Sequence, residues 1–144
     1  FGVNSRLDVL NAEVLNFRLK KLKSVILKRR RNIAIYRKLI NQKFIKIPHD
    51  TKDQFSSCVI FLCLCERRDE LQKYLNSKSI QSLVYYGTPL HKHYASKNRG
   101  LHKTKLPVSE NLAKKVLALP HHQNLTTNQI KLVCREVNKF YKNS

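Results

Sequence analysis

Apolar residues recur at helical spacing through the first forty positions of the chain. They lie three, four or seven residues apart, as along one face of an α-helix. Ser5 and Asp8 form a capping-box-like pair at the start of this stretch. One helix over residues 5–40 would be about 54 Å long, which leaves room for a bend or a break within it. The apolar face is formed by Leu15, Leu19, Leu22, Ile26, Ile33, Tyr36 and Ile40.

The middle of the chain alternates between strand-like and helix-like patterns. Residues 55–65, FSSCVIFLCLC, are a nearly unbroken apolar run of β-forming residues, which predicts a central strand covered on both faces. Residues 67–78 predict a short helix, and residues 80–86, IQSLVYY, predict a second strand. Residues 87–107 hold two of the three glycines and three of the six histidines, and they predict a long loop of functional character.

The remaining sequence predicts two helices around a short strand. The first helix begins near Ser109 and leads into a short strand that ends at Pro120. The second helix begins with a capping box of Thr126 and Gln129 and continues almost to the C-terminus. Together the elements predict one α+β domain over residues 1–144, in which a long N-terminal helix joins a small sheet packed by helices.

The charge of the chain is strongly positive, because 29 Lys and Arg residues face only 9 Asp and Glu residues, for a net charge of +20. Nucleic acid, an anionic membrane, an anionic substrate or an acidic neighbouring domain would each account for it, as would ordinary solvated faces. No apolar run is long enough to span a membrane, so no membrane partner is expected.

A dense group of basic residues lies between Lys20 and Arg31, on the first predicted helix. A nucleic-acid module usually interleaves such residues with exposed aromatic side chains. Here the nearby aromatics, Phe17 and Tyr36, are expected in the core. A solvated or docking face is therefore favoured over a nucleic-acid site, which stays the alternative.

The four cysteines show no metal-binding spacing. Cys58, Cys63 and Cys65 lie in the apolar run, Cys134 lies on the last helix, and no Cys-x-x-Cys or His-x-x-x-His pair completes a metal set. On a strand, Cys63 and Cys65 would point to one face. We expect buried free thiols, no metal site and a reduced, cytoplasmic compartment.

The segment YYGTPLHKHY gathers candidate binding groups in the predicted loop. Tyr85, Tyr86, His91 and His93 could bind sugar hydroxyls or a diphosphate. Alternatively, the tyrosines pack at a strand end and the histidines face water, and composition alone favours that second interpretation. The sequence shows no hydrolytic triad, no paired carboxylates for glycoside cleavage and no phosphate-binding Gly-rich loop.

Several stretches together resemble a known family in order and spacing. They are GVNSRLDVLNAEVLNFRLKKL, RRRNIAIYRKL, RRDELQKYLNSKSIQSLVYYGTPLH and LPVSENLAKKVLALPHHQNLTTNQI. This set resembles the C-terminal part of the DegT/DnrJ-type sugar-nucleotide aminotransferases, which are pyridoxal 5'-phosphate enzymes of fold type I. The resemblance covers nearly the whole chain, from about Gly2 to Tyr141.

The resemblance implies that this chain is the small C-terminal domain of such an enzyme, with residues 5–40 as its connecting helix. The large domain, which carries the Schiff-base lysine in this family, would lie outside the chain. No catalytic residue is therefore expected here, and the chain alone should be inactive and should hold no cofactor. The parent enzyme would be a homodimer that transfers an amino group, with glutamate as the expected donor, to a nucleotide-linked keto-sugar.

Four residues match positions with roles in this family. Asn4 matches the Asn that reaches the cofactor phosphate of the neighbouring subunit, and Arg6 matches the Arg that accompanies it on the same anionic rim. Tyr86 and His91 match the Tyr and His of a His-Tyr-Pro-x-Pro-x-His segment that lines the sugar-nucleotide site.

The chain also departs from the family pattern. Tyr85 stands where the family often has His, and Gly87 stands where it often has Pro. Gln54 and Phe55 occupy the place of a common His-aromatic pair. These differences concern the substrate and the rigidity of the loop more than the fold. The alternative to the enzymatic interpretation is a free-standing basic α+β module that binds nucleic acid through residues 20–31.

Overall fold

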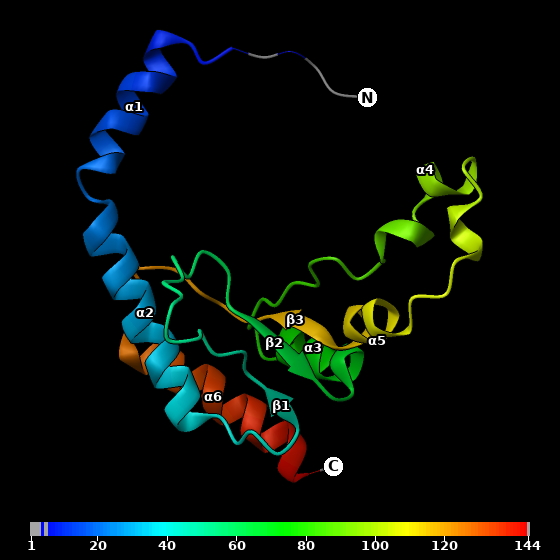
Figure 1. Cartoon of the computed structure of the whole chain (residues 1–144). Coiled ribbons are helices and arrows are strands. Elements are labelled where there is room, and N and C mark those ends of the chain that lie inside the picture. The colour runs from blue at the N-terminus through cyan, green and yellow to red at the C-terminus, as the bar shows by residue number, and fades with distance from the viewer. Residues whose placement is uncertain (1–3, 5, 144) are drawn as a thin grey trace.

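The chain folds around a small antiparallel sheet, as the α+β prediction requires. The computed structural model describes Asn4 and residues 6–143. Its sheet has three strands in the order β1-β2-β3, with β2 in the centre. The strands are β1 (Ile45–Lys46), β2 (Leu62–Cys65) and β3 (Val116–Ala118). Helices surround this sheet, and two segments extend away from it (Figure 1).

The central strand β2 is shorter than the apolar run that predicted it. Its register pairs Cys63 with Leu117 of β3 and Cys65 with Ile45 of β1. Cys63 and Cys65 share one fully buried face, as their spacing predicted, whereas Leu62 and Leu64 are half-buried on the other. The prediction that both faces are covered is therefore wrong for this second face, which borders the groove described below.

The predicted second strand over residues 80–86 is wrong. The segment makes a single isolated bridge, in which Leu83 and Ala118 exchange two backbone hydrogen bonds of 3.1 and 2.7 Å. Ser79 and Tyr86 at its ends have left-handed φ angles of 59° each. An extended strand cannot continue through such residues, so any strand here is confined to residues 80–85.

The N-terminal helical region consists of two helices, α1 (Val9–Leu19) and α2 (Leu22–Leu39). The expected break therefore falls at residues 20–21, and the single helix over residues 5–40 is not formed. Helix α1 begins after Asp8, whose carboxylate accepts the N–H of Asn11 at 2.8 Å. The predicted cap residue Ser5 lies outside the described residues.

Helix α1 leads away from the body of the molecule (Figure 1). It buries none of its residues, and Phe17 is 59% exposed. The expectation that Phe17 lies in the core is therefore wrong, because none of the elements that the structure describes buries a residue of α1. Tyr36 on α2 is fully buried and stacks on Phe61 at 4.7 Å, so the same expectation is confirmed for Tyr36.

The core lies between the buried face of the sheet and three helices, namely α2, α3 (Arg68–Ser77) and α6 (Thr127–Lys142). Helix α6 has the predicted capping box of Thr126 and Gln129. Its predicted apolar face is confirmed, since the first three residues of that face are buried and Phe140 packs against the core. The face consists of Ile130, Val133, Val137 and Phe140.

The predicted long loop contains short helical turns. Residues 88–106, which we call the arm, hold η1 (Leu90–Lys92), α4 (Tyr94–Lys97) and η2 (Leu101–Lys103). The arm extends from the body well away from α1 (Figure 1). It leads into α5 (Pro107–Lys115), which begins with a proline two residues before the predicted start and runs directly into β3.

Within the described part of the chain, no helix combines the length and the apolar character needed to cross a bilayer.

Candidate functional site

An apolar groove of about 550 Å³ lies between β2, α5 and the beginning of the arm; we call it the β2–α5 groove. Leu62 and Leu64 of β2 form part of its wall, and Leu112 of α5 forms another part. Tyr85 and Tyr86 border it where the chain enters the arm. A mostly apolar hollow with a few tyrosine hydroxyls at its edge is typical of a small-molecule site.

Tyr86 is held at the edge of this groove by a strained turn. The side chain is 78% exposed, and its φ of 59° lies in the left-handed region. That conformation costs a non-glycine residue about 1–2 kcal/mol. Gly87 is required beside it, because a Cβ at position 87 would lie 2.7 Å from Cγ1 of Val84. Strain of this kind gathers at functional sites.

His91 is not exposed on the groove wall. Only 8% of it is accessible, and its Nε2 lies 2.9 Å from Oε1 of Glu110 on α5. The nearby His93 lines the groove instead, and its Nε2 contacts the carbonyl of Thr88 at 3.0 Å. The structure therefore brings Tyr86 to the groove and leaves His91 in a buried contact with a carboxylate.

Glu110 is a residue that the sequence reasoning did not single out. Its Oε1 accepts the N–H of Leu106 at 3.3 Å and lies 3.6 Å from Nζ of Lys92, in addition to its contact with His91. The hydrogen bond from His91, helped by that of the Leu106 N–H, lowers the pKa of the Glu110 carboxyl. One signal was available: Glu110 is the only acidic residue between Glu70 and Glu136.

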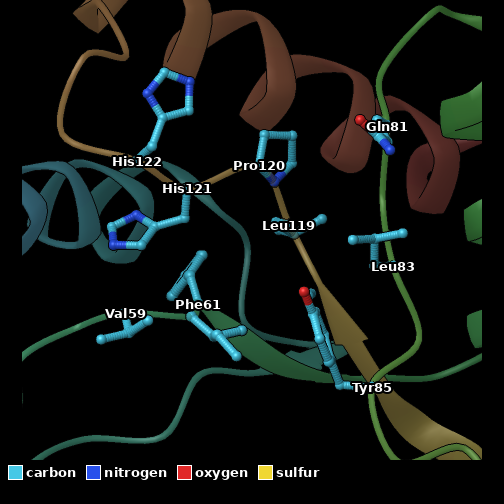
Figure 2. A pocket seen from close by; sticks show the side chains of 11 residues that line it. Val59, Phe61, Gln81, Leu83, Tyr85, Leu119, Pro120, His121 and His122 are labelled. Carbon is cyan, nitrogen blue, oxygen red and sulfur yellow. The ribbon is translucent and has the colours of Figure 1, made fainter. Parts of the chain in front are cut away.

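A second hollow, of about 310 Å³, lies beside Tyr85 (Figure 2). Its walls include Phe61 before β2 and His121 after β3. The Nε2 of His121 lies 2.8 Å from the carbonyl of Cys58, and burial lowers the pKa of the imidazole. A neutral histidine that bonds a backbone carbonyl joins two loops, which is a structural role. Tyr85 also lines the β2–α5 groove, so it lies between the two hollows.

Asn4 and Arg6 lie on an exposed non-helical segment before α1. Neither lines one of the described hollows, and the structure does not bring them to the groove that Tyr86 borders. Their side chains suit an anion, since an amide and a guanidinium both donate hydrogen bonds to phosphate. However, the described residues around Asn4 and Arg6 build no enclosed phosphate site.

Two arginines of the basic group on α2 contact other segments of the chain. Arg29 donates to Oε1 of Gln123 at 3.1 Å, so it joins α2 to the segment after β3. Arg30 pairs with Asp50 at 3.1 Å and lies over the ring of Phe55 at 4.5 Å. The ion pair with Asp50 neutralises one charge of this group, whereas Arg29 keeps its charge on a neutral partner. Because Phe17 is exposed rather than in the core, its position does not count against a nucleic-acid site.

The described residues contain no group of three or more His, Cys, Asp or Glu side chains that could hold a metal ion. All four cysteines are buried and free, as the sequence predicted. Burial raises the pKa of the Cys65 thiol to about 12, and the nearby Arg68 lowers it to a smaller extent.

Comparison with known proteins shows similarity along almost the whole chain. A model of the DegT/DnrJ/EryC1/StrS aminotransferase family matches residues 1–138. A dTDP-3-amino-3,6-dideoxy-alpha-D-galactopyranose transaminase from Aneurinibacillus thermoaerophilus is 32% identical over 96% of the chain. A UDP-2-acetamido-2-deoxy-3-oxo-D-glucuronate aminotransferase from Pseudomonas aeruginosa is 32% identical over 92% of it.

A solved structure agrees with these relatives. Streptomyces venezuelae DesV, in complex with a ketimine intermediate, is 33% identical and superposes with a TM-score of 0.89 over 96% of this chain. The chain covers 38% of DesV, and it spans 38% and 36% of the length of the two curated relatives. The resemblance drawn from the sequence and the predicted fold class are thereby confirmed.

Proposed function

This chain belongs to the DegT/DnrJ/EryC1/StrS aminotransferase family, and we propose that it is the small C-terminal domain of a pyridoxal phosphate-dependent sugar aminotransferase. The enzyme would transfer an amino group, with glutamate as donor, to a keto-sugar linked to a nucleotide. Its large domain, with the Schiff-base lysine, would come from polypeptide beyond these 144 residues. The single observation that carries the proposal is the ordered match over residues 1–138 on a fold that superposes at a TM-score of 0.89.

The substrate class follows from the relatives. The two curated relatives act, by their names, on sugars linked to dTDP and to UDP. A nucleotide sugar carries a diphosphate, and a chain with a net charge of +20 would attract it. Its free cysteines suit a cytoplasmic enzyme.

Each candidate residue receives a binding role rather than a catalytic one. Pyridoxal phosphate, when bound to the complete enzyme, supplies the electron sink for amino transfer. Asn4 and Arg6 would donate hydrogen bonds to its phosphate in the neighbouring subunit of a homodimer. Their exposed position before α1 leaves them available to a second chain. Tyr86 would bind the nucleotide sugar from the edge of the β2–α5 groove, and His91 would support that edge through Glu110.

The experiment that tests the proposal is a chimera with the Aneurinibacillus transaminase. The part of that enzyme that precedes the region matched by this chain is fused to residues 1–144. We expect the chimera to bind pyridoxal phosphate, seen by its visible absorbance, and to aminate the dTDP-linked keto-sugar of that enzyme. A matched truncation of the relative, without this chain, controls for activity of the large domain alone.

The same chimera can also contradict the proposed function. If it folds, as shown by circular dichroism, and binds the cofactor but transfers no amino group to any of a panel of dTDP- and UDP-linked keto-sugars, the proposed function is wrong.

A further inference from the structure

The two ends of the arm meet at one carboxylate. Oε1 of Glu110 contacts His91 at 2.9 Å and Lys92 at 3.6 Å, where the arm begins. The same oxygen accepts the N–H of Leu106 at 3.3 Å, where the arm ends. The backbone N–H of Glu110 in turn donates to the carbonyl of Leu106 at 2.9 Å. Glu110 thus closes the first turn of α5 and the base of the arm at the same time.

We propose that Glu110 is a positioning residue, whose carboxylate clamps the base of the arm and thereby holds Tyr86 and the first arm residues along the β2–α5 groove. Thr88, Pro89 and Leu90 of the arm line that groove beside Tyr86, so the orientation of the arm sets the width of the groove. The consequence for substrate binding rests on the proposed function, whereas the clamp itself does not.

The rest of the arm holds itself together with contacts that do not reach the body. Lys92 donates to the carbonyl of His102 at 2.9 Å, which joins η1 to η2. The hydroxyl of Ser96 donates to the carbonyl of Leu90 at 2.7 Å, which joins α4 to η1. The arm can therefore move as one rigid unit, and its orientation relative to the sheet depends on the contacts at its base.

No neighbouring residue in the sequence can supply the negative charge of Glu110. No other acidic residue lies within residues 71–135, while the arm carries cationic side chains along its length. The groups that face the carboxylate are His91 and Lys92 of η1 and the N–H of Leu106. A neutral amide of the same shape would still offer one oxygen that accepts hydrogen bonds, but it would carry no negative charge, so His91 and Lys92 would lose their anion.

Limited digestion with trypsin tests the clamp in the 144-residue chain itself. In Glu110→Gln we expect cleavage after Lys92 and Lys105, at the two ends of the arm where Glu110 makes its contacts, to accelerate by about fivefold, because the base of the arm opens more often. Cleavage after Lys73 in α3 should keep its rate, which separates arm opening from global unfolding. Glu70→Gln is the matched control, since it removes a carboxylate that pairs with Arg67 on the surface of α3.

A pH profile of the unmodified chain gives a second readout that needs no variant. The measured quantity is the rate of amide hydrogen exchange in the arm divided by the rate in α6, each corrected for its intrinsic rate. We expect this ratio to rise as the pH falls through the lowered pKa of Glu110. In Glu110→Gln that ratio should be high at neutral pH and flat below it. The proposal would be overturned if the arm were cleaved at the same rate in Glu110→Gln and in the parent, or if the exchange ratio of the parent did not change with pH. Neither outcome would contradict the proposed function.

Discussion

The hydroxyl of Tyr36 on α2 donates a hydrogen bond of 2.8 Å to the carbonyl of Pro120, which follows β3 by two residues. The ring of Tyr36 is fully buried, and burial raises the pKa of its hydroxyl, so it stays a donor at any physiological pH. One turn earlier on α2, the buried side chain of Asn32 donates to the carbonyl of His122 at 3.0 Å. Two side chains of one helix therefore fix the path of the chain after β3.

Replacing Tyr36 by Phe should destabilise the fold by about 1–2 kcal/mol, because the Pro120 carbonyl would lose a buried hydrogen bond while the ring keeps its packing. Urea unfolding followed by circular dichroism measures this as a lower midpoint at unchanged slope. Tyr94→Phe is the control, since that side chain is exposed on the arm, and its midpoint should stay within error of the parent.

Alkaline pH should weaken the fold through the buried thiols. Burial raises the pKa of Cys65 from the ordinary 9.0 to about 12, so the folded state keeps its proton while the unfolded chain loses it. This contribution to stability is complete below pH 9 and declines above it, by about 1.4 kcal/mol at pH 10.

The measurement is the free energy of unfolding at pH 8 and at pH 10 for the parent and for Cys65→Ala. The variant should be less stable at both values but should lose less stability between them. An identical difference between the two pH values in both proteins would show that Cys65 does not contribute.

The exposed apolar side chains of α1 should cause the chain to self-associate. Leu10, Val14 and Phe17 fall on one stripe at helical spacing, and all three are exposed. Light scattering should report an average mass above that of a monomer, and changing all three residues to Gln should lower it. Leu132→Gln, which alters an exposed leucine on α6, should leave the mass unchanged. A parent chain that stays monomeric over a wide concentration range would contradict the prediction.

In the chimera with the Aneurinibacillus large domain, Asn4→Ala should weaken cofactor retention. A hydrogen bond to a charged phosphate contributes about 1.5–3 kcal/mol, which corresponds to a loss of roughly tenfold to a hundredfold in affinity. Absorbance of the cofactor during dialysis measures the loss. His91→Ala should leave the cofactor in place and slow the half-reaction with the nucleotide sugar. The reverse pattern would show that the two roles are assigned to the wrong residues.

Binding of nucleic acid to residues 20–31 should be weak and unspecific. Lys28→Gln with Arg31→Gln removes two exposed charges of this group without breaking the contacts of Arg29 and Arg30. Filter binding of duplex DNA at two salt concentrations should give equal affinities for the parent and the double variant. A clear loss of affinity in the variant, together with a steep dependence on salt, would support a nucleic-acid site instead.

Local signals in the sequence predicted the helices well. The capping box of Thr126 and Gln129 and the apolar face that follows it depend on residues within one helix, so the sequence displays them directly. The strand predicted over residues 80–86 was wrong, because β-forming residues favour an extended backbone but do not show whether a neighbouring strand pairs with it; of these residues, only Leu83 forms a bridge. The prediction that Phe17 lies in the core was wrong for another reason. Helical spacing shows that a helix has an apolar face but not which element covers that face.

In the candidate site, too, prediction from the sequence succeeded for a local signal and failed for a contact between distant residues. The resemblance to the family singled out Tyr86, whereas composition alone favoured packing at a strand end, and the structure places Tyr86 at a groove. The partner of His91 was missed, because Glu110 lies 19 positions further along the chain and no short motif joins the two. The orientation of His91 depends on that contact, so its burial could not be read from the segment that contains it.

Helix α1 has a consequence for how the complete protein assembles. An isolated helix of 11 residues is marginal in water, because nucleation costs more than so few hydrogen bonds return. Since α1 buries no side chain against the rest of the chain, its helical order depends on whatever surface it meets. Folding of α1 and recognition of that surface would then be one coupled event. A mismatched neighbour would leave the segment disordered rather than merely loosely bound.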